Sequence, residues 1–298
     1  MKKSKFTLWF MLATVIFCTV ARFCQITLGT DMTSGFLLDD NGFVLDWAYY
    51  LLLILTFGGA VALSLVDVKR NGRFEVGSVV DAKAALIGFA VLVMGVSAAY
   101  EGAMEFNAFS PSVVVAIANI AFGALTALVA FVVLYRKQFT PGVGFAFVVP
   151  ALLFMLRGIF VFIERMVITN IPEYLIRCLS VVGLSAFCML FAKYFSGNRQ
   201  KHTEKALCSV GVVTFVLVVS NAVAVVLADL LAPQEIAERI CVSGYEAEYF
   251  YQQNMGYNGY MMVYPSITDI FGAIFIGATL ISLFVGKKHD MNAEDKEV

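Results

Sequence analysis

The residues of this chain that could do chemistry are a few charged and amide side chains set within long apolar stretches. They comprise three arginines and the carboxylate and amide residues that accompany them: Arg22, Arg157, Arg177, Glu101, Glu164, Asn119, Asn221 and Asp269. Arginine keeps its charge and binds a carboxylate or phosphate through two parallel hydrogen bonds. The set therefore predicts binding of a small anionic or zwitterionic solute, with Arg157 and either Arg22 or Arg177 contacting the anion and the carboxylates balancing or gating them.

A structural role is the alternative interpretation of these charges. Each charge within hydrocarbon costs about 2.5–3.5 kcal/mol on insertion scales, so the charges that persist usually face other helices or water. Buried arginine–carboxylate pairs can also hold helices in register, and arginines near a helix end can extend to the membrane interface. Ser97, Glu101 and Glu105 follow i, i+4 spacing and form one polar stripe, while Arg157 shares a helix face with Glu164.

The positions of the histidines and the lack of metal-binding motifs argue against most enzyme chemistry. His202 and His289 are the only histidines, and both stand beside lysines outside the apolar stretches. This distribution disfavours haem ligation, HExxH zinc hydrolysis and a histidine base within a membrane. The cysteines show no CxxC spacing, although Cys241 could pair with Cys24 or Cys178. We therefore expect no enzyme activity, no metal, no cofactor and no nucleic-acid partner.

Composition identifies the elements that must position these residues as membrane helices. Of 298 residues, 60% are hydrophobic and 14% charged, and the mean hydropathy is +0.83. A water-soluble fold could not bury this much apolar surface. About 20 residues are needed to span a bilayer as a helix. The sequence predicts an all-α integral membrane protein with about eight such spans: Phe6–Ile26, Val44–Val66, Ala84–Met104, Ser112–Tyr135, Val143–Ile163, Pro172–Ala192, Ala206–Ala228 and Ser266–Gly286.

The distribution of basic residues predicts the orientation of these spans. One set of connections carries 16 of the 21 cations, including every lysine, and has a net charge of +8, whereas the other has −9. Because basic loops stay in the cytoplasm, both termini are expected there, in a bacterial cell membrane. The segment Met1–Ala21 could instead be a cleaved signal peptide. By helical rise, most of the candidate site residues lie about 6–10 Å from the midplane in the outer half, and Glu164 lies nearer the outer edge. Those at about 6–10 Å are Arg22, Arg157, Arg177, Asn119, Asn221, Glu101 and Asp269.

Similar polar residues at helix ends suggest an internal repeat of four helices. Residues 1–138 would form the first half and residues 139–298 the second, with an extracytoplasmic loop at about 230–264. The clearest correspondence places Asn119 above Gly123 and Ala127 in the first half, and Asp269 above Ala273 and Gly277 in the second. Small residues at this spacing favour close helix packing, and both helices are expected to line the axis between the halves.

Pro150 is expected to interrupt the fifth span two turns before Arg157. It cannot donate to the carbonyl of Ala146, and interrupted helices build the midplane sites of many transporters. The stretch from Pro150 through Arg157 to Phe162, followed by Pro172–Leu175, resembles a pattern in uncharacterised polytopic membrane proteins of clostridia-type bacteria. That resemblance covers about a tenth of the chain. It implies a Gram-positive cytoplasmic membrane and no known activity.

The leading functional expectation is a transporter or permease for a small anionic or zwitterionic solute. The alternative is a non-transporting membrane sensor or partner subunit, for which the acidic, tyrosine-rich loop at 230–264 would be the contact surface. The lipid bilayer is the expected partner in both cases. A protein partner and a homo-oligomer are both left open.

Overall fold

The computed structural model describes residues 4–29, 41–71, 79–107, 113–165, 172–197, 203–231 and 266–285. Within these ranges the chain forms helices and no strand, which confirms the all-α fold. Apolar runs become helices in hydrocarbon because every backbone N–H and C=O must be satisfied within the segment. The helices are α1 (Ser4–Gly29), α2 (Asn41–Asn71), α3 (Ala82–Asn107), α4 (Val113–Arg136), α5 (Pro141–Ala146), α6 (Val148–Arg165), α7 (Pro172–Phe195), α8 (Thr203–Leu231) and α11 (Ile267–Val285).

The lengths of the helices fit a membrane protein. Seven spans are long and apolar enough to cross a bilayer, one of them made by α5 and α6 together, and α11 contributes a shorter apolar stretch, Ile267–Leu283. At 1.5 Å per residue, the whole of α11 covers about 28 Å, close to the ~30 Å hydrocarbon core. Many large apolar side chains point outward, among them Trp9, Trp47, Phe89 and Phe131. Hydrocarbon solvates such a surface, whereas water would not.

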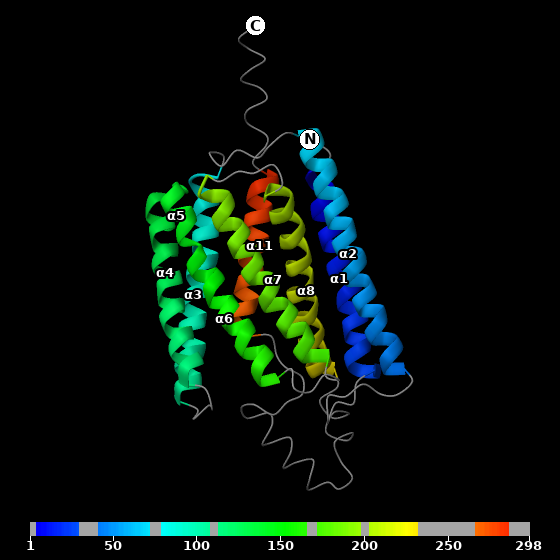
Figure 1. Cartoon of the computed structure of the whole chain (residues 1–298). Helices are drawn as coiled ribbons and strands as arrows, with labels where there is room; N and C mark the ends of the chain where they lie inside the picture. The colour runs from blue at the N-terminus through cyan, green and yellow to red at the C-terminus, as the bar shows by residue number, and fades with distance from the viewer. Residues whose placement is uncertain are drawn as a thin grey trace.

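Successive membrane helices run in opposite directions, so α1 begins and α11 ends at the same end of the bundle (Figure 1). We call the opposite end, where α1 ends and α11 begins, the Arg end, because the arginines Arg22, Arg157 and Arg177 lie in the helix halves nearest to it. The charge distribution predicts that the Arg end faces outward. These three arginines are therefore gathered toward one end of the bundle.

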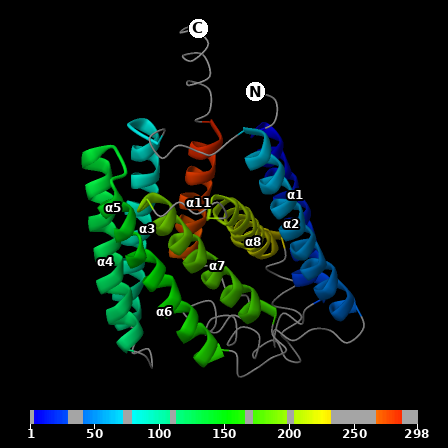
Figure 2. The same cartoon turned by 45° about the horizontal axis from the view of Figure 1, so that its top comes forward.

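Two helix pairs, α1–α2 and α3–α4, lie at opposite edges of the bundle, and the other described helices lie between them (Figure 1). The α1–α2 pair packs on α8 at one edge, and the α3–α4 pair forms the other edge, as two views show (Figures 1 and 2). Helix α11 lies between them and contacts α3, α7 and α8. The expectation that the helices of Asn119 and Asp269 line one axis is wrong, because α3 stands between α4 and α11. The internal duplication itself stays a prediction.

Glycine packing explains why α3 and α4 form so close a pair. A Cβ on Gly95 would lie 2.6 Å from the backbone nitrogen of Ala127, and a Cβ on Gly123 would lie 2.6 Å from that of Ala99. Neither position can hold a side chain without moving a backbone. The close packing predicted from the Asn119–Gly123–Ala127 spacing is thereby confirmed.

The fifth predicted span is interrupted as expected. Helix α5 ends at Ala146, Phe147 forms the junction, and α6 begins at Val148. The backbone N–H of Phe147 donates to Gly144 O at 3.2 Å, a tighter pattern than that of an α-helix. The break occurs where Pro150 leaves the carbonyl of Ala146 without its usual donor.

Aromatic side chains fill the bundle at the end opposite the arginines. We call this group the Phe cluster, and its rings approach as closely as 4.3 Å between the centroids of Phe191 and Phe195. Ring pairs at this range pack favourably and exclude water. The polar and aromatic residues thus occupy different ends of the same helices. The members of the Phe cluster are Phe139, Phe147, Phe187, Phe191, Phe195 and Phe275.

Candidate functional site

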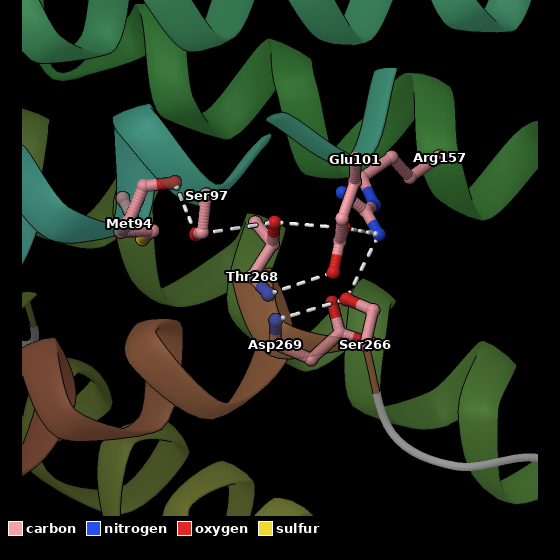
Figure 3. Close-up of polar contacts among 7 residues, drawn as sticks. All are labelled: Met94, Ser97, Glu101, Arg157, Ser266, Thr268 and Asp269. Carbon is pink, nitrogen blue, oxygen red and sulfur yellow. Dashed lines mark hydrogen bonds and ion pairs between the residues drawn. The ribbon is translucent and has the colours of Figure 1, made fainter. Parts of the chain in front are cut away.

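Arg157 is the cation around which three helices meet. Its side chain extends from α6 and is 6% exposed. The Nη2 atom donates to Glu101 Oε2 of α3 at 2.8 Å, and to Ser266 Oγ, which directly precedes α11, also at 2.8 Å (Figure 3). A guanidinium in hydrocarbon needs an opposite charge close by, and Glu101 supplies it. The ion pair joins residues 56 positions apart in the sequence.

Glu101 is held by α11 as well as by the arginine. Thr268 donates its backbone N–H to Glu101 Oε1 at 3.1 Å and its hydroxyl to Glu101 Oε2 at 2.8 Å. Ser97, one turn before Glu101, donates to the Thr268 hydroxyl at 3.3 Å. The polar stripe predicted on α3 is confirmed for Ser97 and Glu101, which both face α11 (Figure 3). The side chain of Glu105 lies outside the described residues.

The start of α11 is fixed by a serine cap. The hydroxyl oxygen of Ser266 accepts the backbone N–H of Asp269 at 3.1 Å, which satisfies one of the free donors of the first helical turn. The same oxygen accepts from Arg157. Ser266 therefore connects the guanidinium to the helix that carries Asp269.

Asp269 adds a second carboxylate to this centre. It is 2% exposed, and its Oδ1 atom is buried with no hydrogen-bond partner among the described residues. The carboxylate interacts electrostatically with Arg157 and Arg177, and with Glu101. Two arginines and two carboxylates from four helices thus interact in one region, where Arg157 and Asp269 are buried and Glu101 and Arg177 are partly buried. We call it the Arg157 network: Ser97, Glu101, Arg157, Arg177, Ser266, Thr268 and Asp269.

Arg22 belongs to a second set of contacts at the same end of the bundle. It is fully buried in α1, donating from Nε to Asn221 Oδ1 of α8 at 3.0 Å and from Nη1 to Gln25 Oε1 at 2.6 Å. Its guanidinium carbon also lies 5.8 Å from the centre of the Tyr49 ring, within the range of a cation–π contact. Two predicted site residues, Arg22 and Asn221, are therefore brought together.

Further contacts extend this second set to α2. Gln25 donates through Nε2 to Asp46 Oδ1, and the Tyr49 hydroxyl lies 3.4 Å from Ser220 Oγ. We call these residues the Arg22 network. Its function is to join the α1–α2 pair to α8, which is the contact that attaches one edge of the bundle to its centre. The members are Arg22, Gln25, Asp46, Tyr49, Ser220 and Asn221.

The remaining predicted site residues lie elsewhere. Asn119 is buried in α4 where α3 approaches, and a Cβ on Gly102 would lie 2.8 Å from its Cβ. It lies against Gly102, the residue that follows Glu101 in α3. The side chain of Glu164 lies outside the described residues, as do Cys241 and the loop at 230–264.

Sequence reasoning missed several polar partners. Thr268, Ser266, Gln25 and Tyr49 were not among the predicted site residues, yet each contacts a predicted arginine or carboxylate. One signal was available, because Ser266 and Asp269 form an S-x-x-D pattern before an apolar run, which is typical of a helix start. Gln25 also stands three residues after Arg22, on the same helix face.

The chain matches no protein-family model, and the comparisons with curated proteins and with solved structures likewise found no match. The resemblance to clostridial membrane proteins therefore stays a prediction. Any functional assignment depends on the geometry of the two networks.

Proposed function

We propose that this multi-pass membrane protein is a transporter for a small anionic or zwitterionic solute, and that the Arg157 network binds it. The main evidence is the group of two arginines and two carboxylates, in which Arg157 and Asp269 are buried and Asp269 Oδ1 has no hydrogen-bond partner among the described residues. Charges inside a membrane are costly and usually serve a function. A network needed only for helix register would be expected to satisfy every one of its buried atoms.

The surrounding helices support this assignment. Arg157 follows Pro150, the proline beside the interruption between α5 and α6, by about two turns, as expected of interrupted helices that build binding sites. The network contains residues from both predicted halves of the chain, residues 1–138 and residues 139–298. Movement of one half relative to the other would therefore change its contacts. The Phe cluster includes the junction residue Phe147 and lies toward the end of the bundle opposite the arginines.

The solute anion would bind by competing with Glu101 for Arg157. A carboxylate or phosphate matches the guanidinium through two parallel hydrogen bonds. Glu101 would remain held by Thr268, which gives it both a backbone and a hydroxyl donor. The exchange therefore does not leave Glu101 without partners. Between the two arginines that the sequence offered as companions of Arg157, the electrostatic contacts of Asp269 favour Arg177.

Uptake into liposomes tests the proposal. Purified protein would be reconstituted and offered a panel of isotopically labelled carboxylates, amino acids and inorganic phosphate, with empty liposomes as the blank. We expect uptake of at least one compound, and loss of that uptake in Arg157→Lys, which keeps the charge but not the planar fork. The matched control is Arg136→Lys, at the exposed end of α4, which should transport normally.

Two results would overturn the proposal. One is the absence of flux for every compound in the panel, combined with a normal host phenotype for Arg157→Ala. The other is flux that Arg157→Lys leaves unchanged. Co-purification of a stoichiometric protein partner, lost on deletion of residues 235–260, would favour the sensor or partner-subunit function instead.

A further inference from the structure

Asp269 differs from the other carboxylate of the Arg157 network in what its oxygens contact. Glu101 accepts hydrogen bonds from Arg157 Nη2, from the Thr268 hydroxyl and from the Thr268 backbone. Asp269 is 2% exposed, and its Oδ1 accepts from no described residue. Protonation of Glu101 would disturb three existing hydrogen bonds, whereas a proton on Oδ1 of Asp269 would displace no hydrogen bond from that oxygen among the described residues. Binding of a proton at Oδ1 of Asp269 also requires no cavity around the carboxylate.

The charges that act on Asp269 come from three of the helices around it. Arg157 of α6 and Arg177 of α7 are positive, and Glu101 of α3 is negative. Helices α8 and α1 also pack on α11, and their described residues contribute no charge to this set. With both carboxylates ionised, the two positive and two negative charges of the network cancel. The network is therefore neutral before solute binds.

A bound anion would break this neutrality. If a solute with one negative charge enters and both carboxylates stay ionised, the buried region acquires a net negative charge, which hydrocarbon disfavours. One proton on a carboxylate restores a net charge of zero. Because Glu101 is committed to three donors, Asp269 is the carboxylate that can accept this proton at least cost in hydrogen bonds.

We propose that Asp269 is the coupling site of the transporter, taking up one proton together with one monoanionic solute. The bond that forms joins Oδ1 of Asp269 to a proton from water on the side where the solute enters, and it breaks when the proton passes to water on the other side. No oxidant or further reactant is required. The proposal depends on the proposed function, and it narrows the substrate class to monoanions moved by proton symport.

Infrared spectroscopy tests the proton site without a known solute. Wild-type protein in lipid vesicles would be measured at a series of pH values, following the C=O stretching band of protonated carboxyl groups. We expect one titrating carboxyl to be missing from Asp269→Asn and present in Glu101→Gln, which is the matched control. Gel filtration and thermal unfolding would show whether each variant is folded. An unchanged titrating band in folded Asp269→Asn would overturn the proposal.

Transport in a pH gradient tests the coupling. For the labelled anion found by the liposome panel, we expect acid on the entry side to speed uptake several-fold in wild type. The ratio of uptake with and without the gradient should fall to one in Asp269→Asn and stay above one in Asp269→Glu. Wild-type uptake that ignores the gradient, or that follows sodium at constant pH, would overturn proton coupling but leave the transporter function standing. Failure of all flux would count against the proposed function, while the infrared result would still decide whether Asp269 binds a proton.

Discussion

Arg22 and Arg157 lie near the same end of the bundle and are buried to a similar degree. The acceptors of the hydrogen bonds described for them differ in charge. The hydrogen bonds from Arg157 go to a carboxylate and a serine, and Asp269 brings a second carboxylate into range. Those from Arg22 go to the neutral amides of Gln25 and Asn221, and its guanidinium also faces the Tyr49 ring. The carboxylate of the Arg22 network, Asp46, accepts a hydrogen bond from Gln25.

This difference separates two roles for the same residue type. The Arg22 network joins the α1–α2 pair to α8, and we expect it to maintain the register of those helices. The Arg157 network contains opposite charges that can be exchanged, and a carboxylate oxygen with no hydrogen-bond partner among the described residues. We therefore propose solute binding at Arg157 and a structural role for Arg22. Substitutions at corresponding positions of the two networks test whether the two arginines differ in this way.

The largest effect is expected from Arg157→Met. It removes one member of a buried ion pair and leaves Glu101 charged in hydrocarbon, which costs about 3–5 kcal/mol. Unfolding in dodecyl sulfate would measure the loss. The double variant Arg157→Met with Glu101→Met is the control and should recover much of the stability, because no unpaired charge remains from that pair. If the double variant is no more stable than the single one, the ion pair is not the source of the effect.

Arg22→Met should have a smaller effect. It leaves two amide oxygens, of Gln25 and Asn221, without their charged donor, at a cost of about 2 kcal/mol. Since the fold and not the solute is expected to depend on Arg22, uptake per folded molecule should stay normal. Quantifying transport against the amount of folded protein in the same liposomes checks this. Abolished transport in a folded Arg22→Met protein would remove the functional distinction between the networks.

The smallest effects come from the hydroxyl groups at the edges of the networks. Thr268→Val removes one donor to Glu101 but keeps the backbone donor, at a cost of about 0.6–1 kcal/mol. Tyr49→Phe removes a longer contact, 3.4 Å from Ser220, and should cost less than Thr268→Val. Unfolding measurements on both variants would rank them. The reverse order would mean that the Arg22 network is the more tightly coupled of the two.

Much of the fold could be predicted from residue types alone. The eight apolar stretches correspond to the observed helices because hydrocarbon forces any such run to satisfy its backbone internally. The interruption before Pro150 and the close approach at Gly123 were also predictable, since a missing donor and a missing side chain act locally. The expectation that the helices of Asn119 and Asp269 line one axis failed, because packing order depends on every helix at once.

The candidate site could be predicted only in part. Arg22, Arg157, Glu101 and Asp269 were identifiable because charges are rare in apolar stretches. Their partners were not, since Gln25, Ser266 and Thr268 are residue types that occur commonly without functional consequence. The sequence also offered either Arg22 or Arg177 as the companion of Arg157, and nothing in the spacing distinguishes them.

Residue types alone specify a bundle of membrane helices in which the charges inside the apolar segments gather toward one end, because the cost of polar groups in hydrocarbon acts on each segment separately. Which of these charges meet depends on the tertiary structure. Glu101 and Arg157 are 56 residues apart, and Arg22 and Asn221 are 199 apart. Their pairing depends on how α3, α6 and α11, and α1 and α8, pack together, which no local pattern specifies. That packing directs the hydrogen bonds of Arg22 to two amide oxygens and those of Arg157 to a carboxylate and a serine.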